Sequence, residues 1–222
     1  MIRSLLTGLL AALAVFGCAP AQTAGPDRAA RWEKDVAAIE KRLKKDPPDA
    51  GGVAFVGSSS IRLWDVGKSF PDCTATNVGF GGSQIPDQTH FVPGLLLPLE
   101  PRAIVFYAGD NDIAAGRDPK AVRDDFAEFA ARVHAELPKT HILFVAIKPS
   151  IARWKQFGRQ AEANALVKAV CAGDERLAYV DVVTPMLGSD GKLDPDLFVK
   201  DGLHLSAKGY AVWTKAVNEA AR

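Results

Sequence analysis

The sequence of 222 residues has little of what marks several common classes of protein. It holds only three cysteines, too few for a disulfide-rich scaffold, and its longest apolar run, residues 9–16, is too short to cross a bilayer. Its formal net charge is +1, so it lacks the excess positive charge that attracts nucleic acid or an anionic membrane surface. These absences favour an ordinary globular protein whose partner is a small molecule.

The N-terminus has the pattern of an export signal. Arg3 followed by the apolar run is typical of a secretory signal peptide, which we place at residues 1–21. Two processing routes are open: cleavage at Ala19-Pro20-Ala21, or lipidation of Cys18, since residues 15–18 resemble a bacterial lipoprotein box. The lipoprotein route is favoured because cysteines are so few. We therefore expect an exported bacterial protein, either free in the periplasm or anchored to the membrane only through Cys18.

Residues 27–222 alternate between helical and extended patterns, as expected of a single α/β domain. Four apolar residues at helical spacing predict an amphipathic helix over residues 27–45 (Trp32, Val36, Ile39, Leu43). Further helices are predicted over residues 86–97, 119–137, 154–172 and 206–221, the last with Ser206 placed to cap it. Runs rich in Val, Ile, Phe and Tyr predict strands over residues 53–57, 74–78, 103–107, 141–146 and 177–182.

Most of these predicted strands are apolar throughout, which is typical of strands covered on both faces. Because strands alternate with helices, and parallel neighbours need long crossovers, we predict a parallel sheet between two helix layers. Ligands bind outside the carboxyl ends of such strands. The residues at that edge are polar and glycine-rich (57–60, 79–83, 109–112, 148–150, 201–204). We therefore expect an active site assembled from these separate loops.

The first predicted strand is followed by three serines, Ser58, Ser59 and Ser60. By itself this triplet is as consistent with a polar turn that caps a helix as with a reactive nucleophile. A serine nucleophile needs a base to take its proton and a group to orient that base. His204 is the one histidine that closes a loop at the ligand edge, and Asp201 is placed to turn back and accept a hydrogen bond from its ring.

A serine nucleophile also needs donors for the negative charge that develops on the substrate oxygen, and three are present. Gly82 has no side chain to obstruct its backbone N–H, and Asn111 offers a side-chain NH2. The backbone N–H of Ser59 is a third donor, at the start of the next helical turn. One edge of the predicted sheet thus holds candidates for every part of a serine hydrolase.

Four short blocks in this order resemble the SGNH or GDSL hydrolase family of esterases and lipases. They are Gly-Ser-Ser-Ser, Asn-Val-Gly-Phe-Gly-Gly, Gly-Asp-Asn-Asp and Asp-Gly-Leu-His (57–60, 77–82, 109–112, 201–204). The resemblance covers nearly the whole chain after the leader. It implies Ser59 as the nucleophile, His204 and Asp201 as the rest of the triad, and the Ser59 N–H, Gly82 and Asn111 as the oxyanion hole.

The resemblance also implies a fold and an activity. The expected fold is a three-layer α/β/α sandwich with a five-stranded parallel sheet in the flavodoxin-like order 2-1-3-4-5. The expected activity is hydrolysis of a small-molecule acyl ester, above all an acetyl ester, because the pattern is closest to the acetylhydrolases related to platelet-activating factor acetylhydrolase. Neither a cofactor nor a metal is implied. Ser58 and Ser60 replace the usual Asp and Leu, so the hydrogen bonds of that carboxylate must come from elsewhere.

The implied strand order bears on the two remaining cysteines. Cys73 precedes the second strand and Cys171 precedes the fifth, which lie at opposite edges of such a sheet, roughly 19 Å apart. A disulfide requires Cα atoms within about 7 Å of each other. We therefore predict two free thiols, although an exported protein with two cysteines would otherwise suggest a bridge.

Several alternatives stay open at this point. Residues 110–112 offer oxygen ligands for a divalent cation, although no further carboxylate at a fixed spacing is evident. Trp64, Arg153 and Trp154 follow predicted strands and either line the substrate pocket or serve packing and the surface. The rival functions are a non-catalytic exported lipoprotein that binds a sugar or cell-envelope fragment, and a flavin-binding electron carrier. The natural substrate and the oligomeric state are not specified by the sequence.

Overall fold

The computed structural model describes residues 29–221, which form a five-stranded, wholly parallel sheet. The order β2-β1-β3-β4-β5 is the predicted one, and its strands are short (β1 Val53–Gly57, β2 Ala75–Asn77, β3 Ala103–Tyr107, β4 His141–Val145, β5 Leu177–Val180). Strand β1 pairs with both β2 and β3, so the strand order reverses beside β1. Ligands bind at such a reversal in open α/β sheets.

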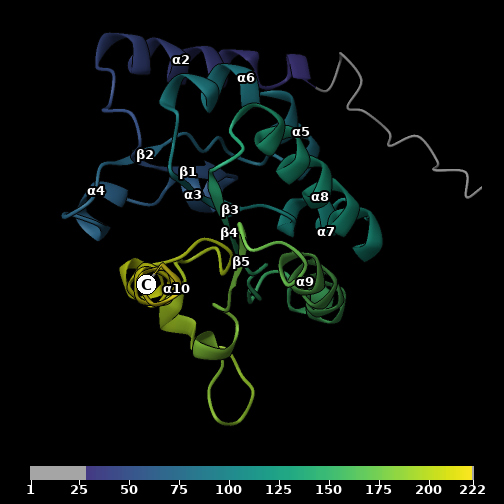
Figure 1. The fold of residues 1–222 in the computed structure, drawn as a ribbon. Coiled ribbons are helices and arrows are strands. Elements are labelled where there is room, and N and C mark those ends of the chain that lie inside the picture. Colours follow the sequence, from purple (N-terminus) through teal and green to yellow (C-terminus); the bar gives the residue numbers. More distant parts are fainter. Residues whose placement is uncertain (1–28, 222) are drawn as a thin grey trace, which may run out of the picture.

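Helices cover both faces of the sheet, as Figure 1 shows. One layer holds five of the labelled helices (α2 Glu33–Lys45, α5 Ile85–His90, α6 Val92–Leu95, α8 Pro119–Glu136, α9 Phe157–Cys171). The opposite layer is built from fewer elements (α3 Ser59–Arg62, α4 Val66–Ser69, α10 Ala207–Ala220). The predicted three-layer sandwich is thereby confirmed.

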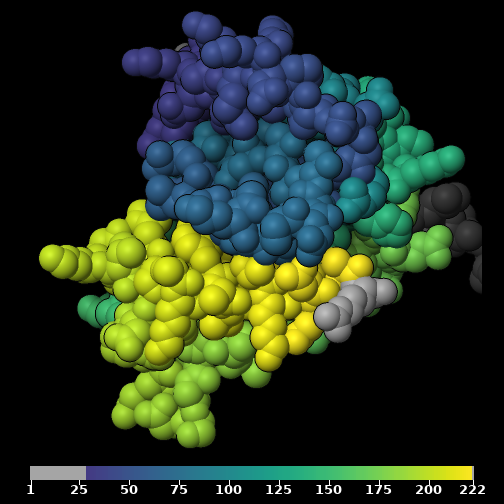
Figure 2. Space-filling model, turned by 90° about the vertical axis from the view of Figure 1, so that its left-hand side faces the viewer, coloured from purple at the N-terminus to yellow at the C-terminus, as the bar shows by residue number. Residues whose placement is uncertain are grey.

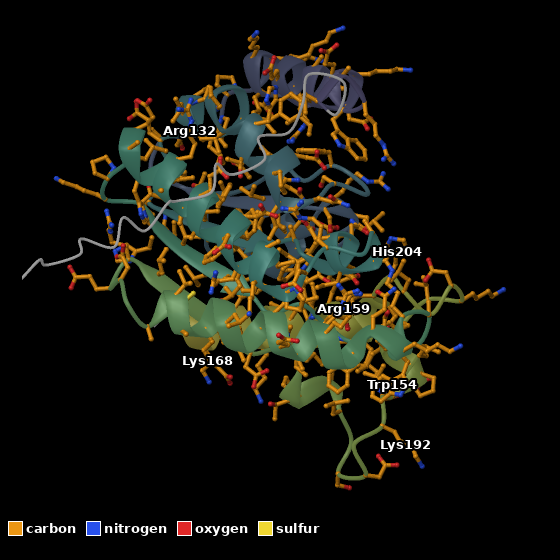
Figure 3. All side chains as sticks on the ribbon, turned by 90° about the vertical axis from the view of Figure 1, so that its right-hand side faces the viewer. Arg132, Trp154, Arg159, Lys168, Lys192 and His204 are labelled. Atoms are coloured by element: carbon orange, nitrogen blue, oxygen red, sulfur yellow. The ribbon has the colours of Figure 1, made fainter. Side chains whose placement is uncertain are left out.

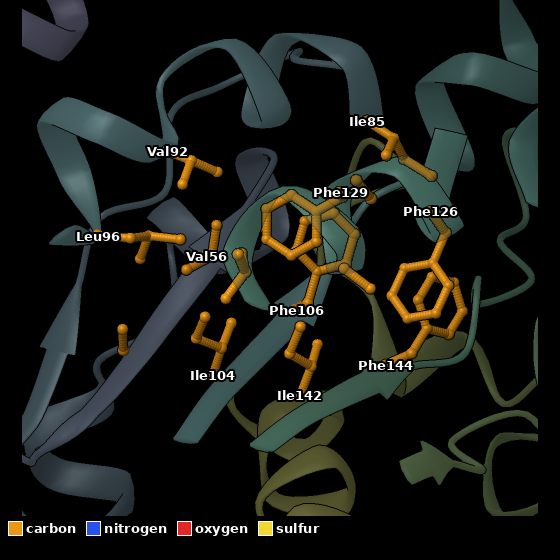
Figure 4. Packing of buried hydrophobic residues seen from close by; sticks show 14 of the residues in the cluster. Val56, Ile85, Val92, Leu96, Ile104, Phe106, Phe126, Phe129, Ile142 and Phe144 are labelled. Carbon is orange, nitrogen blue, oxygen red and sulfur yellow. The ribbon is translucent and has the colours of Figure 1, made fainter. Parts of the chain in front are cut away.

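The strands are apolar throughout because alternate side chains enter two separate cores. In β3, Ile104 and Phe106 face the α8 layer, whereas Val105 and Tyr107 face the α10 layer. Figure 4 shows Phe106 packed with aromatic rings of its own layer, and its ring centroid lies 4.2 Å from that of Phe129. Packing on both faces fixes the positions of the strand ends, from which the loops at the carboxyl edge begin.

The second core joins the segment after β1 to the C-terminal helix. Trp64 stacks on Tyr210 with ring centroids 5.6 Å apart and meets Trp213 edge-on. Figure 2 shows the surface of α3 and α4, in blue, in direct contact with the yellow surface of α10. Residues that are far apart in the sequence, such as Trp64 and Tyr210, are thus held side by side.

The boundaries of two long helices follow local signals. The side chains of Asp118 and Ser206 cap α8 and α10 by accepting hydrogen bonds from backbone N–H groups in the first turn. The single helix predicted over residues 86–97 is wrong: α5 ends at His90, α6 begins at Val92, and a 3₁₀ turn follows (η1 Leu97–Leu99). Pro93 causes the break because it has no N–H and clashes with the preceding turn.

Of three further 3₁₀ turns, η2 (Trp154–Gln156) precedes α9 and forms the start of the helix predicted from residue 154, and two follow β5 (η3 Thr184–Met186, η4 Pro195–Leu197). Cys73 and Cys171 are both free thiols, as predicted from the strand order. No helix within residues 29–221 is long and apolar enough to span a bilayer. The predicted signal peptide and Cys18 lie outside the described residues.

Candidate functional site

The three serines lie where β1 turns into α3. Gly57 ends the strand at φ +146°, and a Cβ at this position would lie 1.9 Å from the Tyr107 carbonyl oxygen, so only glycine fits. Ser58 is the buried N-cap of α3, and Ser59 is its first residue. The chain therefore presents the partly exposed Ser59 hydroxyl at the carboxyl end of the sheet while its two serine neighbours are buried.

The loop before α10 brings His204 to this hydroxyl. The His204 Nε2 lies 3.0 Å from the Ser59 Oγ, and its Nδ1 lies 2.6 Å from the Asp201 Oδ2. Gly202 has φ +63°, a conformation that favours glycine and that allows the chain to reverse between the carboxylate and the ring. The structure thus brings the three predicted triad residues into one hydrogen-bonded row.

Asp201 is held by more than the imidazole. Its Oδ1 accepts the backbone N–H groups of Leu203, at 2.8 Å, and of His204, at 2.9 Å. The hydrogen bond with the His204 ring, followed by these backbone bonds, lowers the pKa of Asp201 to about 2. The carboxylate is therefore ionised at neutral pH and oriented on both oxygens.

The loop after β2 packs tightly against α3. The Asn77 side chain donates to the backbone oxygens of Ile61, at 2.6 Å, and of Trp64, at 3.0 Å, and it accepts the Gly79 N–H. These bonds fasten the serine turn to the loop after the neighbouring strand. Beyond them the loop reaches Gly82, which is exposed at φ +80°.

The predicted oxyanion donors face the same space. Gly82 and Asn111 line one hollow together with Ser59 and His204. Within residues 29–221 the backbone N–H groups of Ser59 and Gly82 have no protein acceptor. The Asn111 NH2 donates one hydrogen bond to the Ser83 carbonyl, at 3.0 Å, which leaves its second N–H free.

This hollow has a volume of about 480 Å³ and a strongly polar wall. Its charged side chains are Asp35, Arg62 and Arg153, and Leu203 is the one large apolar residue among those that line it. Asp35 comes from α2 and Arg62 from α3, so the hollow lies between the two helix layers at the carboxyl edge of the sheet.

Of the three additional pocket candidates, only Arg153 lies at the hollow. Trp64 is 3% exposed and packs among Phe55, Phe70 and the α10 aromatics, so of its two possible roles it has the packing one and does not line the hollow. Trp154 is 42% exposed and stacks on Phe157. In Figure 3 its side chain lies apart from His204, toward the loop of Lys192.

The sequence analysis missed the charged groups behind Asn111. Asp110 is 5% exposed and pairs with Arg153 at 2.9 Å, and Lys148, with a fully buried side chain, lies 3.8 Å from the same carboxylate. Burial lowers the pKa of Lys148. The available signal was a lysine in the apolar stretch that follows β4, because the segment 148–150 stands at the edge of the sheet where ligands bind.

The same charged groups bear on whether residues 110–112 could bind a divalent cation. Asp110 faces the two cations, and the Asp112 Oδ1 accepts the Ile85 N–H at 3.1 Å. Within residues 29–221, no three His, Cys, Asp or Glu side chains are grouped to hold a metal ion. This acidic segment is therefore engaged in hydrogen bonds and ion pairs of the protein.

Comparison with known proteins identifies the family. The model of the GDSL-like lipase/acylhydrolase family matches residues 64–212, which is two thirds of the chain. This chain belongs to the GDSL-like lipase/acylhydrolase family. As a member of that family it is an ester hydrolase. The matched region includes Gly82, Asn111, Asp201 and His204, whereas Ser59 lies just before it and is placed by the geometry.

Individual relatives agree with the family assignment. Human platelet-activating factor acetylhydrolase IB subunit alpha1 is 26% identical over 179 residues, which cover 75% of this chain and 73% of that protein. A solved structure from Streptococcus pneumonia superposes with a TM-score of 0.77 at 19% identity, covering 87% of this chain and 94% of that one. A GDSL-like lipase from Bacteroides thetaiotaomicron gives 0.66 at 20% identity, covering 86% and 96%. At these identities, the solved structures establish that the fold is shared.

Proposed function

We propose that this GDSL-like hydrolase is a serine esterase that cleaves short-chain acyl esters, above all acetyl esters, through an acyl-enzyme intermediate. The observation that carries the proposal is the row of three side chains, in which His204 bonds Ser59 at 3.0 Å and Asp201 at 2.6 Å through its two ring nitrogens. Such a row is the arrangement that activates a serine hydroxyl.

The proposed first step is attack of the Ser59 Oγ on the ester carbonyl carbon, while His204 Nε2 takes the hydroxyl proton. The ionised Asp201 holds Nδ1 in its protonated form and stabilises the imidazolium that results. When the tetrahedral intermediate collapses, the C–O bond of the alcohol breaks and His204 gives its proton to the leaving alkoxide. A water molecule then attacks the acyl-serine with His204 as base, and the acid and the free Ser59 hydroxyl are released.

The charge on the carbonyl oxygen is stabilised by three N–H donors in this proposal. The backbone N–H groups of Ser59 and Gly82 and the second N–H of Asn111 all border the hollow and have no other acceptor within residues 29–221. Donors that are in place before the reaction cost no reorganisation in the transition state.

The wall of the hollow supports a short acyl group. Leu203 is the one large apolar side chain that lines it, and Asp35, Arg62 and Arg153 make the remainder charged. A long alkyl chain would lie against charged groups without apolar contact, which forfeits the gain of about 0.8 kcal/mol for each buried CH2. An acetyl group requires no such surface.

The test compares wild type with Ser59→Ala on p-nitrophenyl acetate, butyrate and octanoate. We expect the highest kcat/KM on acetate and a loss of about 10⁴-fold or more in Ser59→Ala. Ser58→Ala is the matched control, because Ser58 is the adjacent serine and is buried away from His204, so it should retain most of the activity. Equal rates in wild type and Ser59→Ala would refute the esterase and favour the non-catalytic binder.

We also propose that the protein is exported and anchored through Cys18, on the pattern of residues 1–21. Expression in a bacterial host followed by fractionation should place wild type in the membrane fraction and Cys18→Ala outside it. Recovery of wild type in the soluble cytoplasm would overturn this localisation.

A further inference from the structure

Asn111 is held by partners on both ends of its amide. Its Nδ2 donates to the Ser83 carbonyl at 3.0 Å, and its Oδ1 accepts both terminal nitrogens of Arg153, at 3.1 and 3.2 Å. Asn111 and Arg153 follow the neighbouring strands β3 and β4, so two separate loops meet at this contact. The orientation of the amide is therefore specified at both ends, since each end meets a group that would repel the other end.

The orientation of this amide decides whether the residue is useful for catalysis. With the NH2 toward the hollow, Asn111 donates to a developing oxyanion. Turned by 180° about its last torsion, it would present its partly negative oxygen to the same charge. The turned amide would also place its oxygen against the Ser83 carbonyl oxygen and its NH2 group against the Arg153 guanidinium, and both contacts are repulsive. A cationic donor on Oδ1 additionally polarises the amide and makes its N–H groups better donors.

Arg153 is itself held in place from behind. Its Nη1 lies 2.9 Å from the Asp110 Oδ1, which also accepts the Gln160 Nε2 at 3.0 Å. The buried Lys148 Nζ lies 3.8 Å from the other Asp110 oxygen, and it has no hydrogen-bond partner within residues 29–221. The Arg153 side chain is only 21% exposed. Its guanidinium is therefore committed to Asp110 and Asn111 although the residue borders the hollow.

We propose that Arg153 is a positioning residue for the oxyanion hole: it fixes the Asn111 amide with its NH2 toward the reacting carbonyl oxygen and does not bind the substrate directly. This inference rests on the proposed esterase function. It predicts that Arg153 acts entirely through Asn111. The alternative role for this arginine is direct contact with an anionic substrate, and the two roles predict different kinetics.

The first experiment measures kcat and KM for Arg153→Ala and Arg153→Lys on two esters. One is the neutral p-nitrophenyl acetate and the other is p-nitrophenyl hemisuccinate, whose acyl group carries a carboxylate. We expect Arg153→Ala to lower kcat about ten- to hundredfold on both esters with little change in KM, somewhat less than the hundred- to thousandfold loss typical of a deleted oxyanion donor. Arg153→Lys keeps a cation beside Asp110 but lacks the two terminal nitrogens that both donate to the Asn111 oxygen. Compared with Arg153→Ala, it should restore thermal stability to near the wild-type level but restore kcat only in part.

Lys155→Ala is the matched control. Lys155 lies two residues further along, is exposed, and makes no ion pair within residues 29–221, so its loss changes the charge equally and should leave kcat unaltered. Thermal unfolding of every variant shows whether the fold is retained, and Arg153→Lys carries the test if Arg153→Ala does not fold.

The second experiment is a double-mutant cycle with Asn111→Ala on p-nitrophenyl acetate. If Arg153 acts only through Asn111, adding Arg153→Lys or Arg153→Ala to Asn111→Ala causes no further loss in kcat. The proposal would be overturned if the losses in kcat from Asn111→Ala and from the Arg153 substitution multiply in the double variant. It would also be overturned if kcat is unchanged in both Arg153→Ala and Arg153→Lys, or if their only effect is a rise in KM for the hemisuccinate. The proposed function is tested separately by Ser59→Ala. If activity depends on Ser59 but the losses in the double-mutant cycle multiply, only the proposed role of Arg153 is refuted.

Discussion

At the scale of single residues, Asp201 links backbone structure to catalysis. One of its oxygens accepts two backbone N–H groups and the other accepts the His204 ring, so the turn that builds the loop also orients the base. A carboxylate suits this position because it accepts on both sides, whereas an amide accepts on one side and donates on the other.

We therefore expect Asp201→Asn to preserve the turn and to lose the reaction. The Asn oxygen would face the two backbone N–H groups, so its NH2 would face His204 Nδ1 and hold the proton on Nε2, which then cannot take the Ser59 proton. The expected fall in kcat is about 10⁴-fold. Steady-state kinetics on p-nitrophenyl acetate measures it, and Asp190→Asn, in an exposed loop, serves as control. An Asp201→Asn enzyme within tenfold of wild type would contradict the proposed role.

At the scale of elements, Asp112 joins two helices beside the oxyanion loop. It belongs to α7 (Asp110–Ala114), has no exposed surface, and accepts the N–H of Ile85, the first residue of α5. Its second oxygen has no hydrogen-bond partner within residues 29–221. Burial raises the pKa of Asp112 to about 7, since the charged form is poorly solvated.

This raised pKa predicts a pH dependence of stability. Between about pH 4 and pH 7 the folded protein holds a proton on Asp112 that the unfolded chain releases, so stability falls as the pH rises through that range. The slope from this group is at most about 1.4 kcal/mol per pH unit. Urea unfolding at pH 5, 6, 7 and 8 should show a shallower decline for Asp112→Asn than for wild type. Identical slopes in the two proteins would show that Asp112 does not titrate in this range.

At the scale of the whole molecule, the strand order determines the state of the thiols. Cys73 precedes β2 and Cys171 ends α9 before β5, so the two flank opposite edges of the sheet. Cys73 is partly exposed, whereas Cys171 is buried and its pKa is raised to about 11 by burial. Even in an oxidising compartment, the fold keeps the two sulfur atoms from meeting.

Thiol labelling tests this arrangement. In the mature chain, from which Cys18 is cleaved or in which it is lipidated, we expect an aromatic disulfide reagent to modify one thiol, at Cys73. The second thiol should react only after unfolding in urea, because Cys171 is both inaccessible and protonated. Cys73→Ser should abolish the fast phase and retain the slow one. A protein without any reactive thiol after unfolding would reveal a disulfide and refute the strand order.

Much of the fold and of the candidate site could be predicted from the sequence because the signals are local. Apolar runs of strand length marked all five strands within one or two residues, and Ser206 marked the start of α10. The helix predicted through Pro93 was wrong because apolar periodicity outweighed a breaker that was present in the sequence. Trp64 was uncertain because a tryptophan after a strand suits a core as well as a pocket, and only its neighbours on α10 decide between them.

The sequence by itself determined that a serine follows the first strand, that glycines and an asparagine follow the next two, and that an aspartate and a histidine precede the last helix. Strand periodicity and turn chemistry depend on near neighbours, so they can be read along the chain. Only the tertiary structure decided that His204 reaches a hydroxyl 145 positions away and that Arg153 holds an amide 42 positions away. Those contacts depend on how separate loops converge in space, and no local sequence pattern specifies which distant residues will meet.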